Sequence, residues 1–174
     1  MVNWVSMLLV LGKHPHQGQQ IVLTEVVNNA ATGRSIVAGK ASFPEMSPIL
    51  YGASQLIYSY RGHQVVDHGG NILGFSSSVA RLPNDNLGIV ILNNDWNANS
   101  AIAAVKWRLV DEIVIRATSP SSPLVDWVSR YKEIDRRQSK QAKFLLLDHV
   151  ILLFRACRFL SLCARPIAVH HTDN

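Results

Sequence analysis

The residue types that could do chemistry gather in three short segments of the chain: Tyr60–His63, Asp67–Gly70 and Gly74–Ser78. The middle segment combines an imidazole with two adjacent glycines. Such glycines leave a strand bare of side chains, so that a ligand can lie against the backbone and pair with its N–H and C=O groups. A backbone N–H directed at that ligand stabilises a developing oxyanion, typically by about 2.7–4 kcal/mol per donor. These residues are therefore compatible with a substrate-binding sheet edge.

Within that edge, His68 is the residue with acid–base chemistry. Its pKa lies near neutrality, so it can donate to a substrate carboxylate or tune a neighbouring hydroxyl. The preceding Asp67 would point to the opposite face of a strand and would not orient His68. The residues alone also allow a plainer interpretation, a glycine bulge with a half-buried histidine bonded to a turn. Both interpretations stay open at this point.

Pairs of histidines do not amount to a metal site in this sequence. His63 follows a turn glycine and could face His68 across a hairpin, while His14 and His16 flank a proline in a predicted loop. A zinc site needs three or four ligands, and neither pair has a third nearby. We expect no metal and no cofactor.

The central third of the chain has the pattern of an antiparallel meander. Asn and Asp in its turns tolerate unusual dihedral angles and bond their own backbone, and its last segment is rich in β-branched residues. We expect strands at 51–60, 65–68, 74–82 and 87–92, turns at 61–64 and 83–86, and an interruption at Gly69-Gly70.

Helices are expected on both sides of this meander. A helix over 2–11 would end at Gly12, with Trp4, Met7, Leu8 and Leu11 on one face, and a helix over 98–115 would bury Ile102, Val105, Leu109 and Ile113 after an Asp95 or Asn97 N-cap. Residues 21–27 could be helical or extended, and 28–48 are expected to form a long loop, a kind of segment that is often functional. A meander with helices packed on it indicates an α+β fold.

The wider pattern resembles a known family. The order Tyr-x-Tyr-Arg-Gly-His, His-Gly-Gly, Gly-Phe-Ser-Ser and Pro-x-x-x-x-Gly-Ile-Val-Ile-Leu-x-Asn is similar to the C-terminal portion of the serine β-lactamase-like, penicillin-binding domain. That family includes class C β-lactamases, D-alanyl-D-alanine carboxypeptidases and related esterases. The resemblance covers about residues 2–116 and is specific over 51–94. It implies an incomplete domain of that family over 1–118.

The family hydrolyses amides or esters through an acyl-serine. It uses Ser-x-x-Lys as nucleophile and base, Tyr-x-Asn or Ser-x-Asn as proton relay, and Lys-Thr-Gly or His-x-Gly as a third motif on a sheet strand. By resemblance His68 is the third-motif residue, and the substrate-binding residues are His68, Gly69, Gly70 and Asn71. Gly70 would leave room for the substrate, and the N–H of Asn71 would complete the oxyanion hole.

The other two motifs of that family do not stand in their expected places. No Ser-x-x-Lys precedes His68, and the one at Ser129–Lys132 follows the third motif in a polar segment. No Tyr-x-Asn occurs, and Tyr51, Tyr58 and Tyr60 are expected to be strand packing residues. We therefore expect a fragment or pseudoenzyme without hydrolase activity by itself, which could associate with a complementary N-terminal half. The alternative is a non-catalytic module that binds a ligand or peptide along the exposed sheet edge.

Charge and hydropathy limit the partners. The net charge of +5 lies entirely in residues 129–174, because residues 1–128 carry eight basic and eight acidic side chains. We expect no nucleic acid. The family resemblance implies a small amide, ester or peptide ligand instead.

The remaining sequence, 119–174, is expected to be a linker and a basic helical tail, poorly packed or disordered. Its apolar run Phe144–Cys163 includes Asp148, His149, Arg155 and Arg158. These side chains disfavour a membrane span and leave a peripheral amphipathic helix as the alternative. Cys157 and Cys163 are six residues apart and would lie on different helix faces, so they predict neither a disulfide nor a metal site. No signal peptide is recognised, and the compartment stays open.

Overall fold

The computed structural model describes residues 1–139, of which 1–131 form one compact unit. In chain order its elements are α1 (Val2–Leu9), α2 (Thr24–Ala30), β1 (Ser35–Ala38), β2 (Ile49–Tyr51), β3 (Leu56–Tyr60), β4 (His63–Ile72), β5 (Phe75–Leu82), the 3₁₀ turn η1 (Pro83–Asp85), β6 (Leu87–Asn93), α3 (Asn99–Val110), the π-helical η2 (Asp111–Ile115) and α4 (Arg116–Thr118). Residues 127–139 are also helical. The predicted run Phe144–Cys163, with both cysteines, lies outside the described residues.

The six strands form one antiparallel sheet in the order of the chain, β1 to β6. The prediction of an α+β fold built on an antiparallel meander is confirmed. The predicted interruption at Gly69-Gly70 is wrong, because β4 runs unbroken to Ile72 and pairs with β5 without a register shift. The predicted long loop at 28–48 is also wrong in part, since it contains the end of α2 and all of β1.

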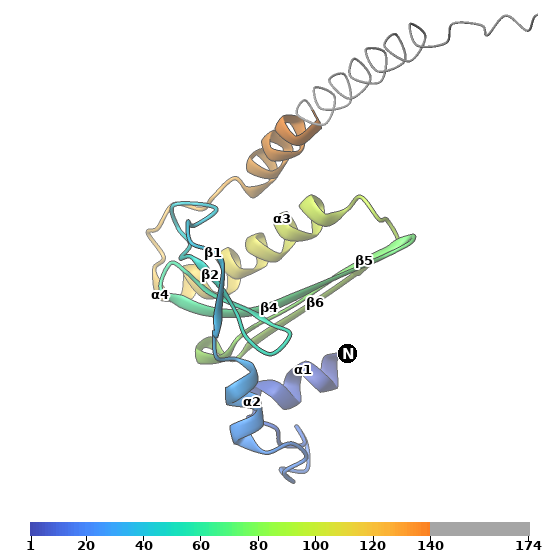
Figure 1. Ribbon diagram of the computed structural model, residues 1–174. Coiled ribbons are helices and arrows are strands. Elements are labelled where there is room, and N and C mark those ends of the chain that lie inside the picture. Colours follow the sequence, from blue (N-terminus) through green and yellow to red (C-terminus); the bar gives the residue numbers. More distant parts are fainter. Residues whose placement is uncertain (140–174) are drawn as a thin grey trace, which may run out of the picture. The chain divides into compact units, whose positions relative to one another are not determined.

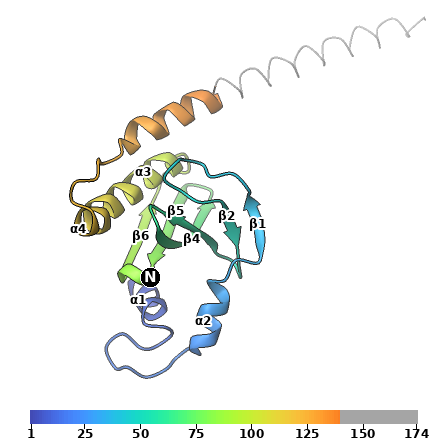
Figure 2. The same ribbon diagram turned by 90° about the vertical axis from the view of Figure 1, so that its left-hand side faces the viewer.

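Helices cover the two faces of this sheet, as Figure 1 and Figure 2 show: α3 lies on one face and α1 on the other. The face of α3 holds the larger core, which is dominated by aromatic side chains and includes Tyr58, Tyr60, Val65, Leu82, Trp107 and Trp127. On the opposite face α1 approaches the sheet closely at Gly88, where an added Cβ would meet Val5 Cγ1 at 2.6 Å. Side chains alternate between these faces along each strand, so neighbouring residues of β4 serve different environments.

The helices begin roughly where predicted but bury different residues. In α3 and η2, Ile102 is buried as expected, but Val105, Leu109 and Ile113 are 38–51% exposed. The buried side chains are instead Lys106, Trp107, Val110 and Val114, since Trp107 packs into the aromatic core. In α1 the predicted face holds for Met7 and Leu8, while Trp4 and Leu11 are largely exposed and Val5 is buried.

The start of α3 also differs from the prediction. Its N-cap is Ala98, which offers no side-chain cap. The carboxylate of Asp95 accepts a hydrogen bond from the backbone N–H of Asn97, one turn too early to cap the helix. Gly12, predicted to end the first helix, adopts a left-handed conformation (φ 86°), and its N–H donates to Met7 O.

Residues beyond the Ser/Pro-rich segment belong to the core of the compact unit. Val125 is buried and Trp127 is 1% exposed. Trp127 Nε1 donates to Asp111 Oδ2 at 2.8 Å, and Phe43 stacks edge-on against the Trp127 ring. This packing extends the compact unit to Tyr131, past the boundary expected at 118.

Candidate functional site

His68 lies on β4 with its side chain exposed on the α1 face of the sheet. The pairing of β3 with β4 ends at Leu56↔Asp67, whereas β5 pairs with β4 as far as Ile72. From His68 to Ile72, β4 therefore has no strand partner on its β3 side among the described residues. Alternate residues of an antiparallel strand direct N–H and C=O groups to opposite edges, so part of this backbone points to the open edge.

The two glycines leave that extended stretch of β4 without side chains. Gly70 pairs with Ser77, and a Cβ added at Gly70 would meet Ser77 Oγ at 2.6 Å. Gly69 and Asn71 are exposed on the same unbroken strand. A hollow of about 320 Å³ adjoins Gly70 and Asn71 and is floored by Ser77 and Leu92. Its size is at the lower end of the range for small-ligand sites.

Behind His68, Asp67 points to the other face and is buried, as the alternation predicts. Tyr58 Oη donates to Asp67 Oδ2 at 2.8 Å, and the Lys106 ammonium of α3 contacts the same carboxylate oxygen. Burial, followed by the charge of Asp67, raises the pKa of Tyr58 well above its ordinary value. Because the carboxylate is held on the α3 side, Asp67 ties β4 to α3 and does not contact His68.

The neighbouring Tyr60 makes a second buried polar link. Its hydroxyl donates to Asp111 Oδ1 at 2.6 Å, and burial raises its pKa. Tyr58 and Tyr60 are thus strand packing residues, as predicted, while Tyr51 is 37% exposed. The two middle residues of the Ser-x-x-Lys match at Ser129–Lys132 make structural contacts. Arg130 forms a bidentate pair with Glu45, and Tyr131 packs on Phe43.

His63 lies at the opposite end of β4 from the glycines and does not face His68. Its Nδ1 is 2.8 Å from Asp85 Oδ1 in η1. Residues 1–139 contain no group of three or more side chains that could hold a metal ion. The same range contains no helix that is long and apolar enough to cross a membrane.

Three buried charged side chains were not predicted from the sequence: Lys106, Arg81 and Asp111. Lys106 interrupts the apolar spacing of α3, and it lies on the face of the helix that packs against Asp67. Arg81 precedes Leu82 in an otherwise small and apolar strand, and its alternation with Ala80 and Leu82 places it on the α1 face. A charged residue at an inward strand position was the available signal for it.

Comparison with known proteins gives two distant relatives with hydrolase names. The chain is 25% identical over 107 residues to the protein named Unguisins hydrolase ungD of Aspergillus violaceofuscus, a match over 61% of this chain and 18% of the relative. It is 26% identical over 101 residues, 58% of the chain and 18% of the relative, to Unguisins hydrolase ungD' of Aspergillus campestris. No family model matches the chain. The chain therefore resembles one segment of hydrolases that are much longer than the match.

Proposed function

We propose that this chain is the C-terminal part of a β-lactamase-related serine hydrolase domain and contributes the wall that receives the acyl group. The observation that carries the proposal is the unbroken strand at His68–Ile72, with bare glycines and an exposed imidazole beside an open sheet edge. The distant similarity to two proteins named as hydrolases supports the same chemistry.

In this proposal each residue of the edge has one task. His68, as the third-motif residue, donates to the substrate or to a hydroxyl of the catalytic relay. Gly70 lets the substrate backbone approach, and the N–H of Asn71 stabilises the oxyanion of the tetrahedral intermediate. The nucleophilic serine, its lysine and the relay tyrosine belong to a complementary N-terminal segment, and without that segment the chain is inactive.

A graft tests this assignment directly. In Unguisins hydrolase ungD of A. violaceofuscus, the matched region is replaced by the corresponding residues of this chain, and hydrolysis of that enzyme's substrate is measured. We expect activity in the graft and a loss of about 100-fold with His68→Ala, within the usual contribution of an acid–base group. The control is His16→Ala, which changes an exposed histidine in the loop after α1.

Two results would contradict the proposal. One is a graft in which His68→Ala has no more effect than His16→Ala. The other is turnover of nitrocefin or p-nitrophenyl acetate by this chain alone that is abolished by one Ser→Ala substitution.

The open edge also favours a second candidate, a non-catalytic module that binds an extended peptide. An unpaired strand edge accepts another strand through main-chain hydrogen bonds. NMR titration of the chain with D-alanyl peptides should then shift the amides of residues 68–72, with no change at His63 at the far end of β4. Absence of shifts across 60–78 would exclude this candidate.

A further inference from the structure

Arg81 is a charged side chain enclosed between the sheet and α1. It lies on β5 between Val66 of β4 and Gly88 of β6, on the face that α1 covers. Only 5% of its surface is exposed. Burial lowers the pKa of Arg81, but an arginine in a protein keeps its proton. The sheet therefore carries a full positive charge beneath α1.

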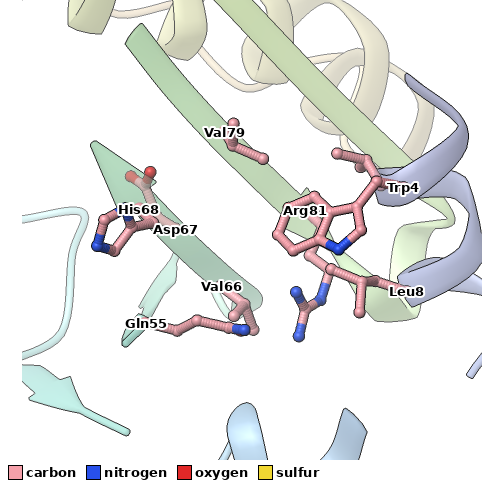
Figure 3. A pocket seen from close by; sticks show the side chains of 9 residues that line it. Trp4, Leu8, Gln55, Val66, Asp67, His68, Val79 and Arg81 are labelled. Atoms are coloured by element: carbon pink, nitrogen blue, oxygen red, sulfur yellow. The ribbon is translucent and has the colours of Figure 1, made fainter. Parts of the chain in front are cut away.

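This charge has no counter-charge among the described residues. Arg81 Nη2 is buried without a hydrogen-bond partner, and no ion pair of Arg81 occurs within residues 1–139. The nearest carboxylate along the adjacent strand, Asp67, is turned away from it (Figure 3) and is held by Tyr58 and Lys106 on the other face. An unpaired buried charge destabilises the folded state by several kcal/mol. A bound anion would remove this penalty.

The guanidinium borders a small pocket (Figure 3). Trp4 and Leu8 of α1 form one wall, and His68 and Val79 lie on the strands. Gln55, just before β3, lines the same pocket, and its Oε1 is also buried without a partner. Two unsatisfied polar groups therefore meet in one apolar enclosure.

The size of the pocket limits what can enter it. It offers about 20 Å³ to the centres of water-sized groups, and one such group needs roughly 10–15 Å³ by this measure. One or two oxygen atoms of a ligand therefore fit beside the guanidinium. A carboxylate has two oxygens in a plane that matches the donor fork of a guanidinium.

We propose that the Arg81 pocket binds one carboxylate group, which accepts hydrogen bonds from Arg81 Nη2. A bound water or the neutral Gln55 amide would complete a hydrogen bond but would leave the charge unbalanced. The carboxylate comes from a free small molecule. This inference does not depend on the proposed hydrolase function.

Thermal unfolding of the full chain tests this proposal. Sodium formate and sodium chloride are compared at equal ionic strength, with the wild type and with Arg81→Met, which keeps length and removes charge. We expect formate to raise the wild-type Tm saturably by about 2–8 °C over chloride and to leave Arg81→Met unchanged. The control Arg108→Met, which removes an exposed arginine of α3, should keep the wild-type response.

A direct observation covers the case in which Arg81→Met does not fold. In the wild type, the amide signals of Val66, Val79 and Arg81 should shift saturably with formate and not with chloride.

If formate gives neither the Tm increase nor the amide shifts, the carboxylate site is refuted.

Discussion

At the scale of single residues, β4 separates two kinds of chemistry by side-chain alternation. His68 is exposed on the α1 face, and Asp67, one residue earlier, is buried on the α3 face with Tyr58 and Lys106. The buried carboxylate fixes the strand from behind. Within residues 1–139 the exposed imidazole makes no hydrogen bond or ion pair, and it can therefore meet a ligand.

The Asp67–Lys106 pair gives a prediction about stability. Asp67→Asn should lower the free energy of unfolding by about 3–5 kcal/mol, because it leaves the Lys106 ammonium buried without a counter-charge. Chemical denaturation measures the loss. The double variant Asp67→Asn with Lys106→Met should recover part of it.

A surface pair provides the matched control. Glu112 pairs with Arg108 and Arg116 on the exposed side of α3 and η2, so Glu112→Gln should cost no more than about 1 kcal/mol. Equal losses for Asp67→Asn and Glu112→Gln would show that the buried pair contributes no more to the free energy of unfolding than the exposed pair.

At the scale of elements, the sheet depends on close approach of α1. Gly88 has no room for a side chain, because Val5 Cγ1 lies 2.6 Å and Leu9 Cδ1 3.2 Å from the position of an added Cβ. Gly88 and Arg81 are paired across β5 and β6. Gly88 on β6 therefore allows α1 to lie close enough to the sheet to cover the guanidinium of Arg81.

We expect Gly88→Ala to destabilise the protein by about 1–3 kcal/mol through overpacking against α1. Denaturation of Gly88→Ala, Val5→Ala and the double variant measures the coupling. The double variant should lose less than the sum of the two single losses, because the shortened Val5 makes room for the new methyl group. Simple additivity would mean that α1 does not contact β6 at this point.

Sequence reasoning succeeded for the elements whose local pattern is strong. β6 follows from its β-branched run, and the turn at 83–86 follows from Pro, Asn and Asp. β1 and β2 were missed because four and three residues among Gly, Ser and Pro carry no period. The buried face of α3 was wrong because an apolar count favours Val105 and Leu109 over Lys106. The buried lysine is favourable because its ammonium pairs with Asp67, which points from β4 toward α3.

The candidate edge was recognisable in part. The glycines and His68 mark a bare strand by their types alone, whereas the absence of a β3 partner beyond Asp67 depends on how far a neighbouring strand runs. Arg81 could not be recognised as unpaired from the sequence, since pairing is decided by residues distant in the chain.

At the scale of the whole compact unit, residues 124–131 close the aromatic core that α3 begins. Trp127 is 1% exposed, and its ring contacts those of Phe43, Tyr60, Trp107 and Tyr131. Its indole N–H donates to Asp111 Oδ2, while the other oxygen of this buried carboxylate accepts from Tyr60.

Trp127→Ala should therefore cost about 3–5 kcal/mol, as expected for the loss of a fully buried aromatic side chain. Trp96→Ala is the control, because Trp96 is 44% exposed and its removal should change the free energy of unfolding little. Urea denaturation compares the two. A loss with Trp127→Ala as small as the control would place residues 124–131 outside the cooperative unit.

The same closure gives a pH dependence. Hydrogen bonds from Arg130 hold the pKa of Glu45 below its usual value of 4.5, so the pair stabilises the folded chain above pH 4.5 and loses this contribution as the pH falls through the folded pKa. Glu45→Gln should cost about 1 kcal/mol at pH 7, and this difference from wild type should shrink in acid. Glu25→Gln, an exposed carboxylate of α2, should show no such convergence.

The indoles of Trp107 and Trp127 come from α3 and from the segment after the Ser/Pro-rich stretch, and their ring centroids are 5.7 Å apart at a tilt of 32°. Chromophores so close in a fixed asymmetric geometry share their electronic excitation. The folded chain should therefore show an exciton couplet in circular dichroism that vanishes when either indole is replaced. An optical signal thus reports, without any label, whether the last part of the compact unit has closed over the sheet.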